Sequence, residues 1–464
     1  MCLSFPLFRS GVTDDKMRIH YNMFFDELKS GVYMVGIGGV SMSALALLLH
    51  ERGISVCGSD CTENHFTKRL KEVGIGVSIG DGEKIEQDVV VYTGAVLDGH
   101  PQLQEAKKAG KRLLTRAELL GKIAEEYPHV ISVAGCHGKT STTAMLMHVF
   151  AQYRKATCHI GGEDLLYSNY DTTGNEYFIT EACEFKRSFL SLYSDTSVIL
   201  NTDFDHSDCY RTKQELLDAY GTFAAQAKRV VVNADDADAR KIPHTISFGL
   251  YNGDIRAQEL KDDGEKYAFT VSERGIPLIR VQLNCVGRVS VYHALAAFAV
   301  ARLYGFSAEE IRFGLQNYYG VKRRFEDMGA WNGVPVICDY AHHPREISAA
   351  LQTAERICKG RVQLVFQPHT YTRTRDFMDD FVYVLSQTEH PVIYKTYAAR
   401  ESFCSEGSAY SLVSRLPSAV YVQSPEQLQE RLRAIVQPND LILVLGAGDI
   451  YQIVEECIKK SLLG

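Results

Sequence analysis

A short glycine segment in this 464-residue sequence is followed directly by a lysine and two hydroxyl residues. It spans residues 135–141, called the ATP loop below, between the apolar run HVISVA and the helix-period run TAMLMHVFAQ. In a strand–loop–helix of this kind, backbone N–H groups bind phosphate, Lys139 can reach the β and γ oxygens, and Thr140 can bind Mg²⁺. A chance Gly-Lys-Thr match is the alternative. The predicted ATP-binding residues are Gly135, Cys136, His137, Gly138, Lys139, Thr140 and Ser141.

Acidic and histidine side chains follow two apolar runs downstream of this loop. Glu181 and Glu184 come at the end of YFITE, and residues 203–206 follow TSVILN. Parallel strands end at one edge of a sheet, so both groups should lie beside the loop. Mg²⁺ prefers oxygen ligands and usually takes one or two carboxylates, with phosphate and water completing its shell. One of these carboxylates together with Thr140 would suffice for a first Mg²⁺ ion, and His206 can support a second; solvated surface acids are the alternative.

Another glycine loop occurs earlier, at residues 36–41, again between an apolar run and a helix-period run. Glycines allow a pyrophosphate to approach the backbone closely at a helix N-terminus. Asp60 ends the next apolar run, where a dinucleotide-binding fold places its ribose-binding acid. Because Ser41 replaces the third glycine of that motif, an NAD(P) site, a diphosphate site for a UDP-sugar and a ligand-free turn all fit. The candidate residues are Gly36, Gly38, Gly39, Ser41, Ser59 and Asp60.

Basic residues gather after apolar runs in the last third of the chain. Guanidinium groups bind phosphate and carboxylate through their planar fork, and phosphoryl transfer depends mainly on positioning and charge stabilisation. We therefore predict that this set faces the ATP γ-phosphate, with structural histidines as the alternative. The set comprises Arg323, Arg324, Asp339, His342, His343, His369, Arg373 and Arg375.

Apolar runs alternate with helix-period segments along most of the chain, which predicts α/β units with parallel sheets and right-handed crossovers. A chain of 464 residues is long enough for about three domains. We predict domains at residues 17–122, 123–320 and 321–464, and we expect residues 1–16 to be an extension or an upstream start.

The composition excludes several classes of protein. The net charge of −7 argues against a general nucleic-acid or membrane-surface role. No run approaches about 18 apolar residues and no signal peptide is recognisable, so we expect neither a membrane span nor secretion. The 12 cysteines lack a C-x-x-C pair and fit reduced thiols in the cytoplasm.

Taken together, these segments resemble the Mur ligase family from about residue 31 to residue 450, nearest to its alanine-adding branch. The matching segments, in order, are GIGGVSMS, GCHGKTST, TEACE, LNTDFDH, RRFE, DYAHHPREI, FQPHTYTRTRDF, YAARE and GAGDI. The resemblance implies an N-terminal Rossmann-like UDP-binding domain, a central P-loop ATPase-like domain, and a C-terminal Rossmann-like domain for adenosine and the amino acid.

The resemblance also implies an activity, namely ATP-dependent ligation of L-alanine to the lactyl carboxylate of UDP-N-acetylmuramate in peptidoglycan synthesis. The reaction would pass through an acyl phosphate, with ATP and Mg²⁺ as cofactors. Thr140 and Glu181 would hold the Mg²⁺ ion, with Glu184 as the alternative to Glu181, and His206 would support a second ion. Asp339 would meet the ribose, and Arg324 the phosphates or the acyl phosphate. His369 and Arg373 would recognise the amino acid and stabilise charge. The implied catalytic residues are Lys139, His206, Arg324, His369 and Arg373.

The match departs from the family at residues 287–293, which read GRVSVYH where the family usually carries G-[KR]-H-N-x-x-N. His293 takes the place of an asparagine expected near adenine, and an imidazole cannot offer the paired hydrogen bonds of an amide. The alternatives are a related ligase adding another amino acid or a peptide, and a degenerate nucleotide-binding paralogue. An NAD-dependent oxidoreductase would leave the ATP loop unexplained. The sequence permits a monomer or a homodimer.

Overall fold

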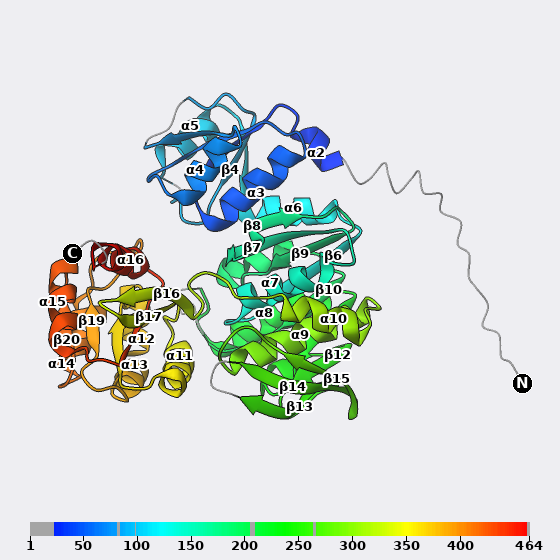
Figure 1. Cartoon of the computed structure of the whole chain (residues 1–464). Helices are drawn as coiled ribbons and strands as arrows, with labels where there is room; N and C mark the ends of the chain where they lie inside the picture. Colours follow the sequence, from blue (N-terminus) through cyan, green and yellow to red (C-terminus); the bar gives the residue numbers. More distant parts are fainter. Residues whose placement is uncertain (1–22, 81–83, 98, 205–208, 263–265, 462–464) are drawn as a thin grey trace, which may run out of the picture. The chain divides into compact units, whose positions relative to one another are not determined.

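The computed structural model describes residues 23–80, 84–97, 99–204, 209–262 and 266–461 (Figure 1). Its strands form three sheets of five, ten and six strands, and helices connect most of the parallel strands. The predicted α/β class with parallel sheets is confirmed, and the ten- and six-stranded sheets also contain antiparallel strands. By its internal contacts the chain divides into two compact units, one made mainly of residues 1–130 and one that contains most of the remainder.

The first unit contains a parallel sheet in the order β3-β2-β1-β4-β5. Because the strand order reverses beside β1, the loop after β1 lies at the topological switch point, where α/β sheets bind ligands. The strands are β1 (Val32–Val35), β2 (Val56–Asp60), β3 (Gly76–Ile79), β4 (Val89–Tyr92) and β5 (Arg112–Thr115). The helices are α2 (Met23–Glu27), α3 (Val40–Glu51), α4 (His65–Glu72), α5 (Pro101–Lys108) and α6 (Arg116–Glu125).

Two helices of this unit begin at capping boxes. Asn64 caps α4 by accepting from the backbone N–H of Thr67, and Thr115 caps α6 in the same way with Glu118. These caps satisfy backbone donors that the first helical turn leaves without partners. The predicted domain boundary between residues 122 and 123 falls inside α6, whereas the first compact unit extends to Val130.

The ten-stranded sheet has the order β15-β14-β13-β12-β11-β10-β6-β9-β7-β8. The run from β6 through β10, β11 and β12 to β13 is parallel, whereas β13-β14-β15 and β7-β8 are antiparallel. The strands are β6 (His129–Ala134), β7 (Ala156–Asp164), β8 (Ser168–Thr172), β9 (Tyr177–Glu181), β10 (Thr196–Ile199), β11 (Arg229–Asn233), β12 (Ile246–Gly249), β13 (Ile255–Asp262), β14 (Tyr267–Glu273) and β15 (Ile276–Gln282). The helices are α7 (Lys139–Phe150), α8 (Lys213–Ala225), α9 (Val289–Leu303) and α10 (Ala308–Gln316), with short helices η1 (Phe185–Ser191) and η2 (Ala239–Lys241).

Helix α7 is buried along almost its whole length, from Thr140 to Phe150. It packs against α9 and α10, and the α10 residue Gly314 lies directly against the backbone of Val149. A side chain at that glycine would overlap the α7 backbone, so close helix packing requires it. Helix α7 begins at Lys139, and its packing therefore fixes the position of the ATP loop.

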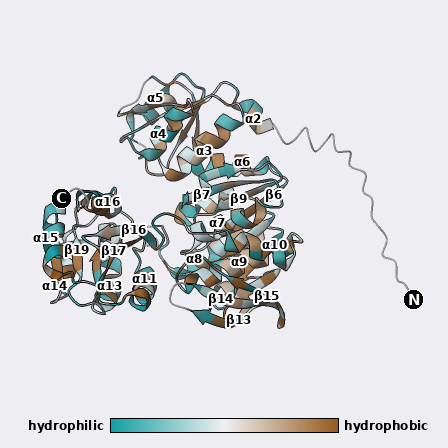
Figure 2. Cartoon of the chain, viewed as in Figure 1, coloured by the Kyte–Doolittle hydropathy of each residue, from teal (hydrophilic) through white to brown (hydrophobic). Residues whose placement is uncertain are grey.

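The six-stranded sheet has the order β16-β17-β21-β18-β19-β20, with β16 antiparallel and the other strands parallel. Two apolar clusters pack around it, and Figure 2 shows hydrophobic residues along its strands and hydrophilic ones on outer helices such as α15. The strands are β16 (Glu326–Trp331), β17 (Val334–Asp339), β18 (Val362–Phe366), β19 (Val392–Tyr394), β20 (Val420–Val422) and β21 (Leu441–Leu445). The helices are α11 (Pro344–Ile357), α12 (Tyr371–Asp376), α13 (Met378–Leu385), η3 (Ser405–Gly407), α14 (Ala409–Ser414), α15 (Pro425–Ile435) and α16 (Ile450–Ser461).

None of the helices in the described part of the chain has both the length and the apolar character needed to cross a bilayer.

Candidate active site

The ATP loop connects the buried strand β6 to α7. Gly135 and Gly138 have φ angles of 142° and 84°, a region that L side chains rarely adopt. A Cβ on Gly135 would also lie 2.9 Å from Cβ of Leu200 in the segment after β10. The glycines therefore allow the chain to turn sharply into α7, whose N-terminal N–H groups can bind an anion.

The side chain of Lys139 folds back onto the preceding residues of the loop. Its Nζ donates to the carbonyl oxygens of Gly135 at 2.5 Å and Cys136 at 3.1 Å, and it forms an ion pair with Glu184 at 3.0 Å. Burial alone would lower the pKa of Lys139, but Glu184 and the neighbouring thiols of Cys183 and Cys136 raise it above its ordinary value. Lys139 is therefore a cation beside the phosphate cradle, and Glu184 is its partner.

Glu181 lies at the end of β9, beside Thr140. Its Oε1 accepts from the backbone N–H of Gly161 at 2.5 Å, and its carboxyl is hydrogen-bonded by the Thr140 hydroxyl. Burial raises the pKa of Glu181, although Lys139, the Gly161 N–H and Thr140 oppose this effect. A bound cation stabilises a carboxylate that is poorly solvated, so Glu181 and Thr140 fit a metal ion.

A magnesium ion suits this pair better than a metal that needs a full set of protein ligands. Among the residues that the structure describes, no group of three or more His, Cys, Asp or Glu side chains could hold a metal. Mg²⁺ needs only one or two protein carboxylates when phosphate oxygens and water complete its octahedral shell. The predicted second-ion residue, His206, lies outside the described residues.

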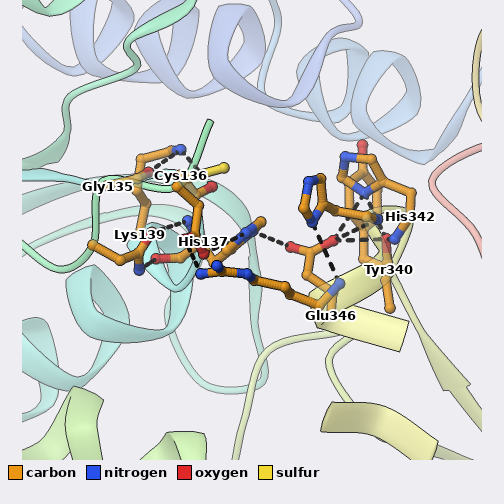
Figure 3. A network of polar contacts seen from close by, with 12 residues as sticks. Gly135, Cys136, His137, Lys139, Tyr340, His342 and Glu346 are labelled. Carbon is orange, nitrogen blue, oxygen red and sulfur yellow. Dashed lines mark hydrogen bonds and ion pairs between the residues drawn. The ribbon is translucent and has the colours of Figure 1, made fainter. Parts of the chain in front are cut away.

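His137 connects the ATP loop to residues distant in the sequence (Figure 3). Its backbone N–H donates to Asn201 Oδ1 at 3.0 Å, and Asn201 Nδ2 donates to the His137 carbonyl at 2.9 Å. The ring Nδ1 lies 2.9 Å from Glu346 Oε1 on α11, and Nε2 lies 3.4 Å from Asp203. The prediction that residues after TSVILN lie beside the loop therefore agrees with the position of Asp203.

A cavity of about 590 Å³ opens beside the loop. It is lined on one side by His137, Gly138 and Ser141, and on the other by Arg324 and Asp339. Residues that follow β6 and the last residue of β17 thus meet at one cavity, as expected for ligand sites at the carboxyl ends of strands. The structure brings the predicted basic residue Arg324 and the predicted acid Asp339 to the ATP loop.

Arg324 and Asp339 interact electrostatically within this cavity. The Arg324 guanidinium lies over the ring of Tyr340, 5.1 Å from its centroid. The Asp339 carboxylate accepts from the backbone N–H groups of Phe325 at 2.8 Å and Ala341 at 2.7 Å. Burial raises the pKa of Asp339 to about 6, although Arg324 opposes the shift. Asp339 thus also shapes the segment that carries Arg324.

His293 lies in the same cavity, with its ring directly against Gly138 of the loop. Burial and the nearby Arg324 lower its pKa to about 4, so the imidazole is neutral at ordinary pH. The preceding residue, Tyr292, donates to Asp235, whose carboxylate also accepts from the backbone N–H of Leu250. The sequence did not predict a role for Tyr292. The acidic segment after β11, which contains Asp235, is the signal that a polar partner is needed there.

His369 and Arg373 lie together at the start of α12, with Arg373 Nη1 3.3 Å from His369 Nδ1. The His369 ring stacks on Tyr397 with centroids 5.5 Å apart, and its centroid lies 5.7 Å from that of His342. Neither His369 nor Arg373 lines the cavity described above. Arg375 instead pairs with its neighbour Asp376.

The glycine loop of the first unit is organised by Asp60. Asp60 Oδ2 accepts from the backbone N–H of Gly38 at 2.8 Å, and Asn64 Nδ2 donates to the Gly38 carbonyl at 3.1 Å. The Ser41 hydroxyl accepts from Arg116 Nη1 at 3.2 Å. Arg116 thus places a cation beside the start of α3, and nothing near it in the sequence marks it as a site residue.

Ser59 has a different place from the other predicted residues of this loop. It is buried, and its hydroxyl donates to Gln102 Oε1 at 2.8 Å. Its carbonyl oxygen accepts from the N–H groups of Gly36 at 2.8 Å and Ile37 at 3.0 Å. Ser59 therefore supports the loop through its backbone, and of the three loop glycines only Gly39 is exposed, whereas Gly36 is half-buried and Gly38 is buried.

Substitution of Gly38 by alanine tests the prediction that this loop binds the diphosphate of a sugar nucleotide. The added Cβ would lie 2.6 Å from Thr67 Cγ2 and 2.9 Å from Asp60 Oδ2, so Asp60 must move away from its N–H donor. Loss of that charge-assisted contact should raise the KM for the sugar nucleotide about tenfold and leave the KM for ATP unchanged. Gly99→Ala, whose Cβ meets no atom within 4 Å, is the matched control. Steady-state kinetics would refute the role if both variants behaved alike.

Three family models match the chain in sequence order. The model described as "Mur ligase family, catalytic domain" matches residues 31–128, and "Mur ligase middle domain" matches residues 133–301. "Mur ligase, glutamate ligase domain" matches residues 323–448.

Curated relatives match over nearly the full length. The UDP-N-acetylmuramate–L-alanine ligase of Clostridium perfringens is 37% identical over 457 residues, covering 94% of this chain and 100% of the relative. That of Acetivibrio thermocellus is also 37% identical, covering 93% of this chain and 96% of the relative.

Solved structures agree with this result. The UDP-N-acetylmuramate–alanine ligase of Thermotoga maritima superposes with a TM-score of 0.81 and 25% identity, covering 93% of this chain and 99% of that one. A murein peptide ligase from Psychrobacter arcticus shares the fold with a TM-score of 0.71, 22% identity, and coverage of 93% and 98%. The predicted family and the predicted three-domain α/β architecture are confirmed: the chain belongs to the Mur ligase family.

Proposed function

We propose that this chain joins L-alanine to the lactyl carboxylate of UDP-N-acetylmuramate with hydrolysis of ATP to ADP and phosphate, as a step of peptidoglycan synthesis. The observation that carries the proposal is the cavity in which the ATP loop faces Arg324 and Asp339. Ligation by phosphate activation needs a phosphate-binding loop and cations positioned around the transferred group. The relatives that match over the full length carry the same activity in their names.

The chemistry follows from the weak electrophilicity of a carboxylate. A carboxylate oxygen attacks the γ-phosphorus, the bond to the bridging oxygen breaks, and ADP leaves. The alanine nitrogen then attacks the acyl carbon, phosphate leaves, and the nitrogen loses a proton to give the amide. Lys139 and the loop N–H groups would bind the phosphates, and Arg324 would stabilise charge on the acyl phosphate. His369 and Arg373 would bind the amino acid.

We also infer a Mg²⁺ ion bound by Thr140 and Glu181. The Thr140 hydroxyl of the ATP loop and the poorly solvated Glu181 carboxyl at the end of β9 lie together. When bound, the ion would neutralise charge on the phosphate oxygens. Glu184 is less suited to this role because it forms the ion pair with Lys139. His206 would support a second ion.

In the first unit, we infer that the UDP-sugar diphosphate binds at the loop after β1. The N-terminus of α3 and the guanidinium of Arg116 would supply positive charge there, and Gly36, Gly38 and Gly39 would allow close approach. The domain limits 17–122, 123–320 and 321–464 are proposed on the same basis. Since both nucleotide substrates belong to the cytoplasm, we infer that the enzyme acts there.

Phosphate release from ATP tests this function directly. The assay contains UDP-N-acetylmuramate and, in separate reactions, L-alanine, L-serine or glycine. We expect release that requires both the sugar nucleotide and L-alanine. Release with another amino acid in preference would identify a related ligase instead. A folded protein that binds UDP-N-acetylmuramate but releases no phosphate would be a degenerate binder, for which the altered segment at residues 287–293 is the motivating observation.

A further inference from the structure

Helix α11 contacts the neighbouring part of the chain at both of its ends. At its N-terminal end, Arg345 pairs with Asp203, and Glu346 Oε1 lies 2.9 Å from His137 Nδ1 in the ATP loop. At its C-terminal end, Arg356 pairs with Asp262 and also contacts the Tyr267 hydroxyl. Of these contacts, only the one between Glu346 and His137 reaches the ATP loop. The N-terminal end therefore contacts the nucleotide site, whereas the C-terminal end only attaches the helix.

Glu346 has two functions at the N-terminal end. Its Oε2 accepts from the backbone N–H groups of His342 at 3.0 Å and His343 at 3.3 Å, which completes a capping box. Its other oxygen binds His137, as Figure 3 shows. One carboxylate thus fixes both the start of α11 and the side chain of a loop residue that is 209 positions away.

Several charged and polar groups surround the ring of His137. Besides Glu346, its ring faces Asp203 at 3.4 Å and the thiol of Cys136, and its centroid lies 5.2 Å from that of His343. Burial alone would lower the pKa of His137, but Cys136, Glu346 and Asp203 raise it well above its ordinary value. Despite burial, His342 and His137 hold the pKa of Glu346 well below its ordinary value. The contact is therefore between an imidazolium and a carboxylate.

We propose that Glu346 is a positioning residue whose contact with His137 sets the conformation of the ATP loop. Asn201 binds the backbone N–H and carbonyl of His137, and Glu346 binds its ring, so this loop residue is anchored through both its backbone and its side chain. Hydrogen bonds between charged groups are stronger and more directional than neutral ones. The inference rests on the proposed function, because the consequence of this contact is the affinity of the loop for ATP.

Glu346→Gln is the decisive variant. A glutamine keeps the size of the side chain and can still accept from the N–H groups of the capping box, but it loses the charge that faces His137. The measurement is calorimetric titration with a non-hydrolysable ATP analogue in the presence of Mg²⁺, using the full chain. We expect the Kd to rise about tenfold, the usual effect of a lost charge-assisted hydrogen bond, while binding of UDP-N-acetylmuramate is unchanged.

Two further variants act as controls. Glu310→Gln changes a glutamate in the equivalent capping-box position of α10, where its carboxylate binds Ser307. It should leave the Kd for the analogue unchanged. Arg356→Ala loosens the other end of α11 without touching the loop. If Arg356→Ala raised the Kd as much as Glu346→Gln, docking alone would explain the effect and the proposal would be wrong.

A double-mutant cycle with His137→Gln tests the contact itself. We expect the double variant to bind the analogue about as weakly as the worse single variant, because both changes remove one interaction. Additive effects would overturn the proposal. The pH dependence gives an independent readout, since the contact is present below the raised pKa of His137 and is lost as the pH rises through it. In Glu346→Gln, which lacks the carboxylate, the Kd for the analogue should change less over this pH range.

These measurements separate the proposal from the proposed function. If the wild-type chain binds the analogue but releases no phosphate with any amino acid, the function is wrong while the Kd comparison still tests Glu346. If phosphate release is normal and the Kd is the same in Glu346→Gln and wild type, the function stands and the positioning role is refuted.

Discussion

Replacement of Lys139 by alanine is expected to lower phosphate release from ATP by about a thousandfold, the usual effect of losing a group that stabilises developing charge. The Nζ of Lys139 lies within the turn of the ATP loop, bonded to the carbonyl oxygens of Gly135 and Cys136. When phosphates bind the N–H groups of the loop, this cation lies within the same turn and can neutralise them. Initial rates at saturating UDP-N-acetylmuramate and L-alanine measure the effect.

The single variant also removes the partner of a buried carboxylate. Glu184 is 2% exposed, and leaving it unpaired costs about 3 to 5 kcal/mol of stability. The matched control is the double variant Lys139→Met with Glu184→Gln, which removes both charges together. We expect the double variant to unfold at a higher denaturant concentration than Lys139→Ala and to be equally inactive. Activity in the folded double variant would show that Lys139 is not needed for phosphate transfer.

Replacement of Glu181 by glutamine is expected to lower kcat about a hundredfold and to raise the Mg²⁺ concentration needed for half-maximal activity, since a metal supplies several kcal/mol of charge stabilisation. Glutamine can still accept from the Gly161 N–H, so the local structure should be kept. The assay is phosphate release across a Mg²⁺ titration, with chelation by EDTA expected to abolish wild-type activity. Glu184→Gln should leave the Mg²⁺ midpoint unchanged, and a shift in that variant instead would transfer the metal role to Glu184.

The stability of the Glu181 variant should move in the opposite direction from its activity. Burial raises the pKa of this carboxyl above its value in the unfolded chain. An acid of this kind favours folding while it is protonated, and that contribution is lost as the pH rises above about 4.5. At neutral pH without metal, glutamine avoids the cost of burying the charge, so the Tm should be equal or higher. A lower Tm would show that Glu181 is a structural residue.

The sequence by itself determined the local motifs of this protein. Residues 135–141 are contiguous, and glycines with a following lysine and threonine allow few other conformations between a strand and a helix. The same applies to the glycine loop at residues 36–41 and to Glu181 and Asp60 at strand ends. Alternating apolar and helix-period runs predicted the α/β class, because they record which side of each element is buried.

Only the tertiary structure decided which of these motifs meet, and how. Glu184 and Glu181 are three positions apart in the sequence, but one is the ion partner of Lys139 and the other lies beside Thr140. Ser59 belongs to the same strand end as Asp60, yet its hydroxyl is buried against Gln102. Alternation along a strand sends neighbouring side chains to opposite faces, and the sequence does not say which face a ligand meets.

The contacts of α11 show the same division most clearly. The segment DYAHHPREI predicted a site in the last domain, but nothing in it indicates that Glu346 binds His137 or that Arg345 pairs with Asp203. Local propensity and periodicity depend on residues a few positions apart, whereas these ion pairs depend on how separate sheets pack. Long-range electrostatic contacts therefore had to come from the fold, and they are the ones that connect the ATP loop to the rest of the active site.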